Sequence, residues 1–203
     1  MSFYNHVILP KLCDFAMGNK ELVPYRKRVI GAAEGRVVEI GVGSGRNLPF
    51  YGPSAKEILA LEPAPKLVAM ARRASHRAMP INFIEASAEA IPLDDHSADT
   101  VVTTWTLCSI PHAARALAEM RRILRPGGKL LFAEHGLAPD ESVRRWQNFL
   151  TPAWKRIGGG CHLNRPIRTM IESSGFQIDR LDTGYIRGPK SMTFMYEGSA
   201  RLS

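Results

Sequence analysis

The chain lacks most of the features that mark secreted, disulfide-bonded or membrane-spanning proteins. Its 203 residues include only three cysteines, Cys13, Cys108 and Cys161, which lie far apart and form no CxxC pair. An odd, scattered set argues against a disulfide framework and a zinc knuckle, and fits a reducing cytoplasm. No apolar run approaches the roughly 18–20 residues that cross a bilayer. The N-terminal MSFYNHVILPKLCDF shows no signal-peptide pattern. We therefore expect one cytoplasmic domain.

Basic residues are in excess, because the chain has 27 Lys and Arg but only 19 Asp and Glu, which gives a net charge of +8. The basic residues are spread along the chain, and the longest block is Arg26-Lys27-Arg28. No RNP-like aromatic segment or recognition helix accompanies them, so we expect no nucleic-acid partner. A basic solvated surface explains the excess, and attraction of anionic substrates or peripheral contact with lipid headgroups stays open.

Short apolar runs alternate with stretches of helical period along most of the chain. The expected strands are 36–40, 57–61, 81–85, 100–104 and 129–133, and the expected helices are 65–75, 112–124, 141–157 and 166–174. This alternation predicts a mostly parallel α/β sheet with helices on both faces. The later stretches FQIDRLDTG and MTFMYEG have no helix between them and predict an antiparallel pair at the sheet edge.

The ends of the predicted helices follow from proline and glycine. Pro126-Gly127-Gly128 is expected to stop the helix at 112–124. Residues 2–33 are expected to be helical and to be broken by Pro10 and Pro24.

A glycine-rich turn, EIGVGSG at Glu39–Gly45, follows the first expected strand. The dinucleotide fingerprint is G-x-G-x-x-G, whereas here the spacing is G-x-G-x-G and Arg46 stands where the third glycine of that fingerprint would be. No Gly-Lys-Ser/Thr follows, which excludes the phosphate loop of nucleotide hydrolases. Pro49 prevents a long helix from running straight on from the turn.

Two acidic residues narrow the choice of ligand. Glu39 lies two residues before the turn, where a carboxylate opposes pyrophosphate and suits a ligand that carries positive charge. S-adenosylmethionine (SAM) has a sulfonium and an ammonium group and no phosphate. Glu62 ends the second expected strand and is placed to accept ribose hydroxyls, as NAD would also require. Together with the glycine spacing, Glu39 favours SAM over NAD.

These motifs resemble class I SAM-dependent methyltransferases. The matching stretches within residues 35–135 are EIGVGSG, LALEP, EASAEAIPLDDHSADTVV and RRILRPGG. The resemblance implies a Rossmann-like sheet of seven strands in order 3-2-1-4-5-7-6, with the last strand antiparallel, and SAM as cofactor. The cofactor-binding residues that it implies are Glu39, Gly41, Gly43, Gly45, Asn47, Glu62, Pro63, Ser87, Ala88, Glu89, Thr104 and Trp105. Ser87 replaces an acid that often meets the adenine amino group, so Ser87 or the Ala88 backbone is expected there.

A closer resemblance covers 101–165. TLCSI, Glu134-His135, WQNFLTPAWKRIGGGCHLNR and the later GPK resemble the methyltransferase-like 7 group, whose animal members are membrane-associated alkyl-thiol methyltransferases. The resemblance implies methyl transfer to a small nucleophile, first of all a thiol or sulfide. N-methylation of a phospholipid headgroup or small amine stays open, as does a non-catalytic SAM-binding module. The animal members carry a hydrophobic N-terminal anchor that this sequence lacks, so we do not expect their membrane residence here.

The catalytic candidates lie after the fourth and fifth strands and in the GGGCHLNR loop. They are His135, Cys161, His162 and Arg165. His135 would take a proton or steer a thiol, or else form a structural hydrogen bond. Cys108 and Cys161 are expected to be small buried residues rather than nucleophiles. The spacing of these cysteines and histidines matches no metal-site signature, so no metal is expected.

We expect one domain over 1–203, made of an N-terminal helical lid at 1–33, a SAM-binding core at 34–135 and substrate-side helices and edge strands at 136–203. Within the lid, an apolar stripe repeats at helical spacing and consists of Tyr4, Ile8, Leu12 and Phe15. A lid or ordinary packing on the sheet is favoured over an interfacial membrane helix, because Pro10 interrupts the stripe and few basic residues flank it. The sequence leaves open whether the protein is a monomer or a homodimer.

Overall fold

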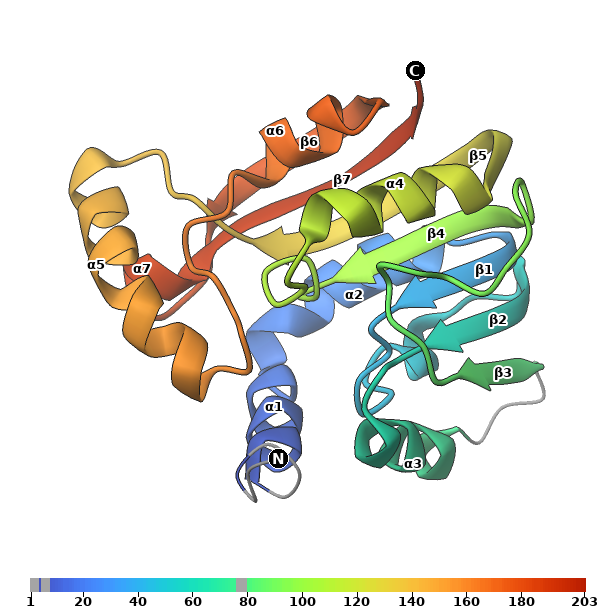
Figure 1. The fold of residues 1–203 in the computed structure, drawn as a ribbon, viewed down its shortest axis with the longest axis horizontal. Helices are drawn as coiled ribbons and strands as arrows, with labels where there is room; N and C mark the ends of the chain where they lie inside the picture. Colours follow the sequence, from blue (N-terminus) through green and yellow to red (C-terminus); the bar gives the residue numbers. More distant parts are fainter. Residues whose placement is uncertain (1–3, 5–7, 76–79) are drawn as a thin grey trace.

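The computed structural model of the chain describes residue 4 and residues 8–75 and 80–203. Its centre is a seven-stranded sheet in the order β3-β2-β1-β4-β5-β7-β6 (Figure 1). The strands are β1 (Gly35–Ile40), β2 (Ala55–Leu61), β3 (Ile81–Ile84), β4 (Ala98–Thr104), β5 (Leu124–His135), β6 (Phe176–Tyr185) and β7 (Phe194–Leu202). The first five pair in parallel, and β7 lies antiparallel between β5 and β6. The predicted sheet order and antiparallel edge are confirmed.

Helices cover both faces of the sheet, as expected. The α-helices are α1 (Leu9–Met17), α2 (Val23–Val29), α3 (Pro65–Ala74), α4 (Ala113–Ile123), α5 (Glu141–Ile157), α6 (Ile167–Ser173) and α7 (Lys190–Thr193), and the 3-10 helices are η2 (Lys20–Leu22), η3 (Ile30–Ala32) and η4 (Leu48–Phe50). Successive strand residues point to opposite faces. Val38 therefore packs in the core that α4 and α6 cover, and Val37 in the core that α2, η3 and α3 cover.

The structure corrects the expected roles of two prolines. Pro10 and Pro24 stand in the first turns of α1 and α2, where a proline costs no helical hydrogen bond, so they begin these helices rather than break them. Helix α4 ends at Ile123, just before Pro126, as expected, and 124–128 belong to an irregular start of β5.

Helices α1 and α5 lie beyond the carboxyl ends of the central strands (Figure 1). The Asp14 carboxylate ties α1 to the glycine turn, since it accepts hydrogen bonds from Ser44 Oγ at 2.6 Å and from Arg46 Nε at 2.7 Å. The apolar stripe faces outward, because Phe15 is 83% exposed and Leu12 49% exposed. Packing of this stripe on the sheet, one of the two favoured interpretations, is therefore wrong.

Candidate functional site

The three glycines of the turn serve different purposes. All have positive φ, at +70°, +57° and +86° for Gly41, Gly43 and Gly45, where a side chain is strained. A Cβ at Gly41 would lie 2.6 Å from the Thr106 side chain, and one at Gly45 would lie 3.0 Å from Ala71 Cα. A Cβ at Gly43 would meet nothing closer than 3.9 Å. Gly43 is thus the position whose missing side chain leaves room for a ligand.

This difference predicts different outcomes for two matched substitutions. Gly41→Ala and Gly43→Ala each lose about 1 kcal/mol to the left-handed backbone, and Gly41→Ala loses about 1 kcal/mol more to overpacking. Gly43→Ala additionally weakens SAM binding about tenfold, about 1.4 kcal/mol. Urea unfolding and calorimetry on both variants provide the measurements. Equal SAM affinity in Gly43→Ala and the unaltered protein would contradict an approach of the ligand at this glycine.

Glu62 lies at the end of β2 with its carboxylate against the turn. Its Oε2 accepts a hydrogen bond from Gly43 N at 3.1 Å, and its Oε1 accepts one from Ala64 N at 3.0 Å. Burial raises the pKa of this carboxyl group, and the two backbone donors oppose that rise. Each carboxylate oxygen has a second lone pair, so the group can still accept two ribose hydroxyls. Pro63 follows it at an exposed position.

Glu39 is buried beneath the turn in a network that the sequence did not reveal. It accepts hydrogen bonds from Asn47 Nδ2 at 2.7 Å and from the Tyr51 hydroxyl at 2.9 Å. Asn47 also donates to Thr104 Oγ1 at 2.8 Å and accepts from Arg26 Nε at 2.9 Å. Burial raises the pKa of Glu39, and the two donors and the charge of Arg26 oppose that rise. The network joins α2, the turn and the ends of β1 and β4.

Arg26 and Tyr51 had no signal in the sequence, because neither belongs to a recognisable motif. Arg26 is only 4% exposed, and burial lowers its pKa to about 10. Its guanidinium lies 4.8 Å from the ring centroid of Trp105, which adopts a positive φ of 50°. Among the described residues, the indole Nε1 of Trp105 is buried without a hydrogen-bond partner.

The segment after β3 holds the residues expected to meet adenine. Ser87 is exposed, and its Oγ accepts a hydrogen bond from Glu89 N at 3.2 Å. Glu89 in turn accepts one from His112 N at 3.0 Å, which ties this segment to the start of α4. Ala88 is buried.

On the acceptor side, three residues from distant parts of the chain meet. Cys108 Sγ, His135 Nε2 and Cys161 Sγ all lie within 4.8 Å of one another, with 3.2 Å between His135 Nε2 and Cys161 Sγ. Cys108 is buried, whereas His135 and Cys161 are partly exposed. Burial lowers the pKa of His135, but contact with Cys161 and the charge of Glu134 outweigh this, so the pKa is raised. The pKa of Cys161 is raised by its contact with Cys108 and by burial.

His162 and Arg165, two of the expected catalytic residues, contact backbone oxygens of the segment after β4. His162 N donates to Cys108 O at 2.8 Å, and its Nδ1 lies 3.1 Å from the same oxygen. Arg165 is buried and donates to the carbonyl oxygens of Leu107 and Ile110. Both residues fasten the loop after α5 to the segment after β4. This brings Cys108 and Cys161 together.

Gln147 on α5 is a further residue that sequence reasoning missed. Its side-chain amide donates to Gly136 O and Leu163 O, both at 2.9 Å, and its Oε1 accepts from Ala138 N at 2.9 Å. The side chain is 1% exposed. A buried glutamine inside a strongly basic helix was the available signal. It fixes the loop after β5 relative to α5.

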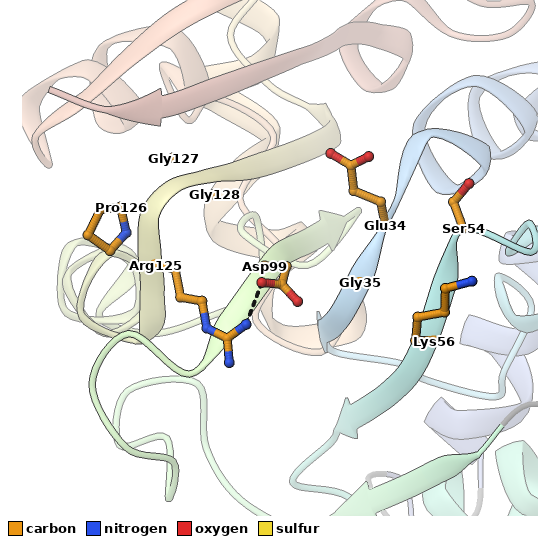
Figure 2. Close-up of a pocket in the computed structure, with 9 residues that line it drawn as sticks. All are labelled: Glu34, Gly35, Ser54, Lys56, Asp99, Arg125, Pro126, Gly127 and Gly128. Atoms are coloured by element: carbon orange, nitrogen blue, oxygen red, sulfur yellow. Dashed lines mark hydrogen bonds and ion pairs between the residues drawn. The ribbon is translucent and has the colours of Figure 1, made fainter.

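Two hollows on the described surface do not enclose the group of candidate site residues. One of about 580 Å³ lies at the amino ends of the strands, opposite to the edge where parallel sheets bind ligands (Figure 2). Among the charged residues that line it, Arg125 pairs with Asp99, and Glu34 pairs with Lys129. The other, about 600 Å³, is lined by Ser44 and Gly45 of the turn and by α1. The site residues themselves gather at the carboxyl edge.

Comparison with known proteins agrees with this geometry. A family model described as "Methyltransferase domain" matches residues 38–132. Thiol S-methyltransferase TMT1B of Rattus norvegicus is 36% identical over 169 residues, which cover 80% of this chain and 69% of that protein. The chain belongs to the thiol S-methyltransferase family. It is therefore a SAM-dependent methyltransferase.

More distant relatives share the fold or part of the sequence. Phosphatidylethanolamine N-methyltransferase of Cereibacter sphaeroides is 28% identical over 149 residues, covering 68% of this chain and 73% of that protein. A crystal structure of a SAM-dependent methyltransferase from Thermotoga maritima superposes with a TM-score of 0.68 at 20% identity, covering 99% of this chain and 100% of that one. The latter shows the fold alone.

The residues at the carboxyl edge of this methyltransferase fit SAM. Gly43 leaves space beside the turn, the Glu62 carboxylate retains free lone pairs, and the carboxyl group of Glu39 is buried at the end of β1, directly before the turn. A carboxyl group at the position of Glu39 does not suit a pyrophosphate, which needs donors and a helix N-terminus. Only the 3-10 helix η4, which contains Pro49, follows the turn. The predicted absence of a long helix there is confirmed.

Proposed function

We propose that the protein transfers a methyl group from SAM to a small thiol or sulfide. The observation that carries this proposal is its 36% identity to a thiol S-methyltransferase across 80% of the chain. The acceptor side of the site agrees, because it presents sulfur and imidazole groups at the ends of β4 and β5 and no carboxylate hydrogen-bonded to His135 among the described residues. A thiol with a pKa of about 8.5 needs little help from a base.

SAM supplies an electrophilic methyl group on a cationic sulfur. The residues of this chain bind and orient the reactants: Glu62 takes the ribose, the turn at Gly41–Gly45 takes the amino-acid end, and Ser87 or the Ala88 backbone takes adenine. His135 and Cys161 face the acceptor from the opposite side. The rate gain comes from alignment of the acceptor sulfur with the methyl group and from exclusion of water.

The test is a panel of acceptors with isotopically labelled SAM. Alkyl thiols are expected to yield methyl thioethers, identified by mass spectrometry, at rates well above those for matched amines and phospholipids. Each thiol is paired with the alcohol of the same carbon skeleton as the control for hydrophobic binding. Turnover of an amine or phospholipid with no product from any thiol would reject this proposal.

That outcome would promote a second candidate, N-methylation of a lipid headgroup or small amine. The supporting observation is the 28% identity to a phosphatidylethanolamine N-methyltransferase, together with the net charge of +8. A protonated amine must lose its proton before attack, so this reaction needs a base, whereas the thiol reaction does not.

We assign α1 and the segment up to 33 as a lid over the cofactor site. The Asp14 contacts to Ser44 and Arg46 support this assignment. Asp14→Ala should weaken α1 docking by about 1 kcal/mol, the scale of one net hydrogen bond and an exposed ion pair. Hydrogen exchange should speed up in α1 alone, with global unfolding unchanged. Glu21→Ala, on η2, is the matched control, and equal changes in the two variants would contradict the lid.

We also propose that exposed apolar side chains of α1 and α5 make peripheral contact with a membrane. Phe15 and Leu12 on α1 and Trp146 and Phe149 on α5 are exposed large apolar side chains, and Trp146 and Phe149 form an edge-to-face pair. None of the described helices is long and apolar enough to span a bilayer.

The three free cysteines support a reducing compartment, the cytoplasm.

A further inference from the structure

The cluster of Cys108, His135 and Cys161 has the composition of a metal site. Two sulfurs and one imidazole nitrogen converge within 4.8 Å from the segment after β4, the end of β5 and the loop after α5. Two thiolates and a histidine are the donors that Zn²⁺ prefers, and three protein ligands leave the fourth tetrahedral position free. The sequence spacing concealed this set, because its members are brought together only by the fold.

The dimensions of the cluster suit a tetrahedral ion. Zinc–sulfur bonds of about 2.3 Å and zinc–nitrogen bonds of about 2.0 Å place the donor atoms about 3.5–3.8 Å apart. The observed His135 Nε2 to Cys161 Sγ distance is 3.2 Å, and no pair exceeds 4.8 Å. Shifts of about 1 Å or less, within the reach of side-chain rotation, would therefore complete the geometry.

Neighbouring side chains hold the backbone segment that carries Cys108. His162 donates to the backbone oxygen of Cys108, and the Arg165 guanidinium donates to the carbonyl oxygens of Leu107 and Ile110. Buried arginine on backbone oxygens alone is costly. The contacts of Arg165 and His162 keep the loop that carries Cys161 against the segment that carries Cys108. Cys108 lies 2% exposed at the back of the cluster, while Cys161 and His135 form its open side.

We propose that Cys108, His135 and Cys161 bind Zn²⁺ and that the fourth coordination position receives the sulfur of the acceptor thiol. The second half of this statement rests on the proposed function, and the first half does not. Binding of Zn²⁺ displaces one proton from each cysteine, and binding of the acceptor displaces its thiol proton to solvent. The metal thus holds the acceptor as an oriented thiolate.

The methyl transfer then balances without a further reagent. The acceptor sulfur forms a bond to the methyl carbon as the bond from that carbon to the sulfonium sulfur breaks. The bonding electron pair stays on the leaving sulfur and neutralises its positive charge. The product is a neutral thioether, a weaker ligand than a thiolate, so it leaves and the fourth position opens again.

The first experiment measures metal binding without any turnover. The full chain, purified under reducing conditions and supplied with Zn²⁺, should retain one equivalent by elemental mass spectrometry. Replacement by Co²⁺ should give thiolate-to-cobalt charge-transfer absorption and the intense visible bands of a tetrahedral site. Cys161→Ala and His135→Ala should each lose most of both signals, and Cys13→Ala, which removes a thiol outside the cluster, should keep them.

The second experiment asks what occupies the fourth position. An alkyl thiol added to the Co²⁺ protein should strengthen the charge-transfer band, whereas the alcohol of the same skeleton should not. Failure to retain a metal, bands that survive in Cys161→Ala, or isolation of a metal-free protein with a Cys108–Cys161 disulfide would each overturn the metal site. Thiol methylation by such a metal-free protein would leave the proposed function standing. A metal site that ignores thiols, in a protein that methylates only amines, would instead reject the acceptor assignment and the proposed function together.

Discussion

Glu62→Ala should weaken SAM binding by about 1.5–3 kcal/mol, or roughly 10- to 150-fold, the scale of hydrogen bonds to a charged group. The carboxylate is only 7% exposed and each of its oxygens already accepts one backbone N–H, so each oxygen keeps one lone pair that can accept a ribose hydroxyl. Calorimetric titration with SAM measures the loss. Glu57→Ala is the control, because Glu57 lies on the same strand but bonds to Asn82 and Arg36.

Removal of Glu62 also frees Gly43 N and Ala64 N, which could disturb the turn without any contact to ribose. A ligand comparison separates the two effects. The variant and the unaltered protein are each titrated with methylthioadenosine and with its 2′,3′-dideoxy analogue. If Glu62 binds the hydroxyls, the variant loses affinity for the first ligand and little for the second. Equal losses for both would show that the residue only shapes the turn.

The sheet was predictable because its information is local. Strand-length apolar runs such as 100–104 and helical periodicity such as that of 112–124 are repeated at short spacing, and their alternation restricts the topology. The structure lengthens the strand at 100–104, shortens the helix at 112–124 by one residue at each end, and confirms the order of the strands. The errors occur at Pro10 and Pro24, where a residue that breaks a helix interior is equally suited to begin one.

The site was predictable only where a motif carried it. Glu39 and Glu62 stand at strand ends that the sequence marks clearly. Arg26, by contrast, lies on a helix of basic residues, and nothing local shows that it is the one turned inward to Asn47. Burial of a charged side chain depends on which elements meet over it, and that depends on tertiary contacts.

The acceptor side illustrates the same limit for His162 and Arg165, whose catalytic role stays a prediction. His162 and Arg165 were expected to act on substrate, since their motif marks a functional loop. The loop folds back onto the segment after β4, so these polar groups are used on the backbone there and the neighbouring Cys161 faces His135 instead. A motif identifies the loop, but the direction of each side chain depends on packing against a segment more than fifty residues away.

The second large effect concerns the charge of Glu39. Glu39→Gln should weaken binding of SAM by about 1.5–3 kcal/mol, because a unit charge at an effective dielectric constant of 20 is worth about 4 kcal/mol at 4 Å and about half that at 8 Å. Glutamine keeps the shape and can still accept from Asn47 or Tyr51, so the fold should survive. Circular dichroism and thermal unfolding check this before any titration.

Titration with three ligands identifies which positive charge of SAM interacts with Glu39. SAM carries a sulfonium and an ammonium group, S-adenosylhomocysteine keeps only the ammonium, and methylthioadenosine has neither. If the carboxylate acts through its charge, Glu39→Gln loses most affinity for SAM, less for S-adenosylhomocysteine and almost none for methylthioadenosine. An equal loss for all three would mean that Glu39 merely balances Arg26, to which the network links it through Asn47.

The pH dependence of SAM affinity provides an independent check with a fixed sign. Burial raises the pKa of Glu39. Burial also raises the pKa of Tyr51 well above its usual range, and Arg26 has a pKa of about 10, so neither of these two groups changes charge in acidic solution. As the pH is raised, Glu39 is therefore the first group of this network to change charge. The ionised carboxylate attracts a cationic ligand, so affinity for SAM should rise with pH through the raised pKa of Glu39 and then level off. Glu39→Gln should show no such rise, and methylthioadenosine should show none with either protein. A rise that persists unchanged in the glutamine variant would assign it to another group and remove Glu39 as the counter-charge of the cofactor.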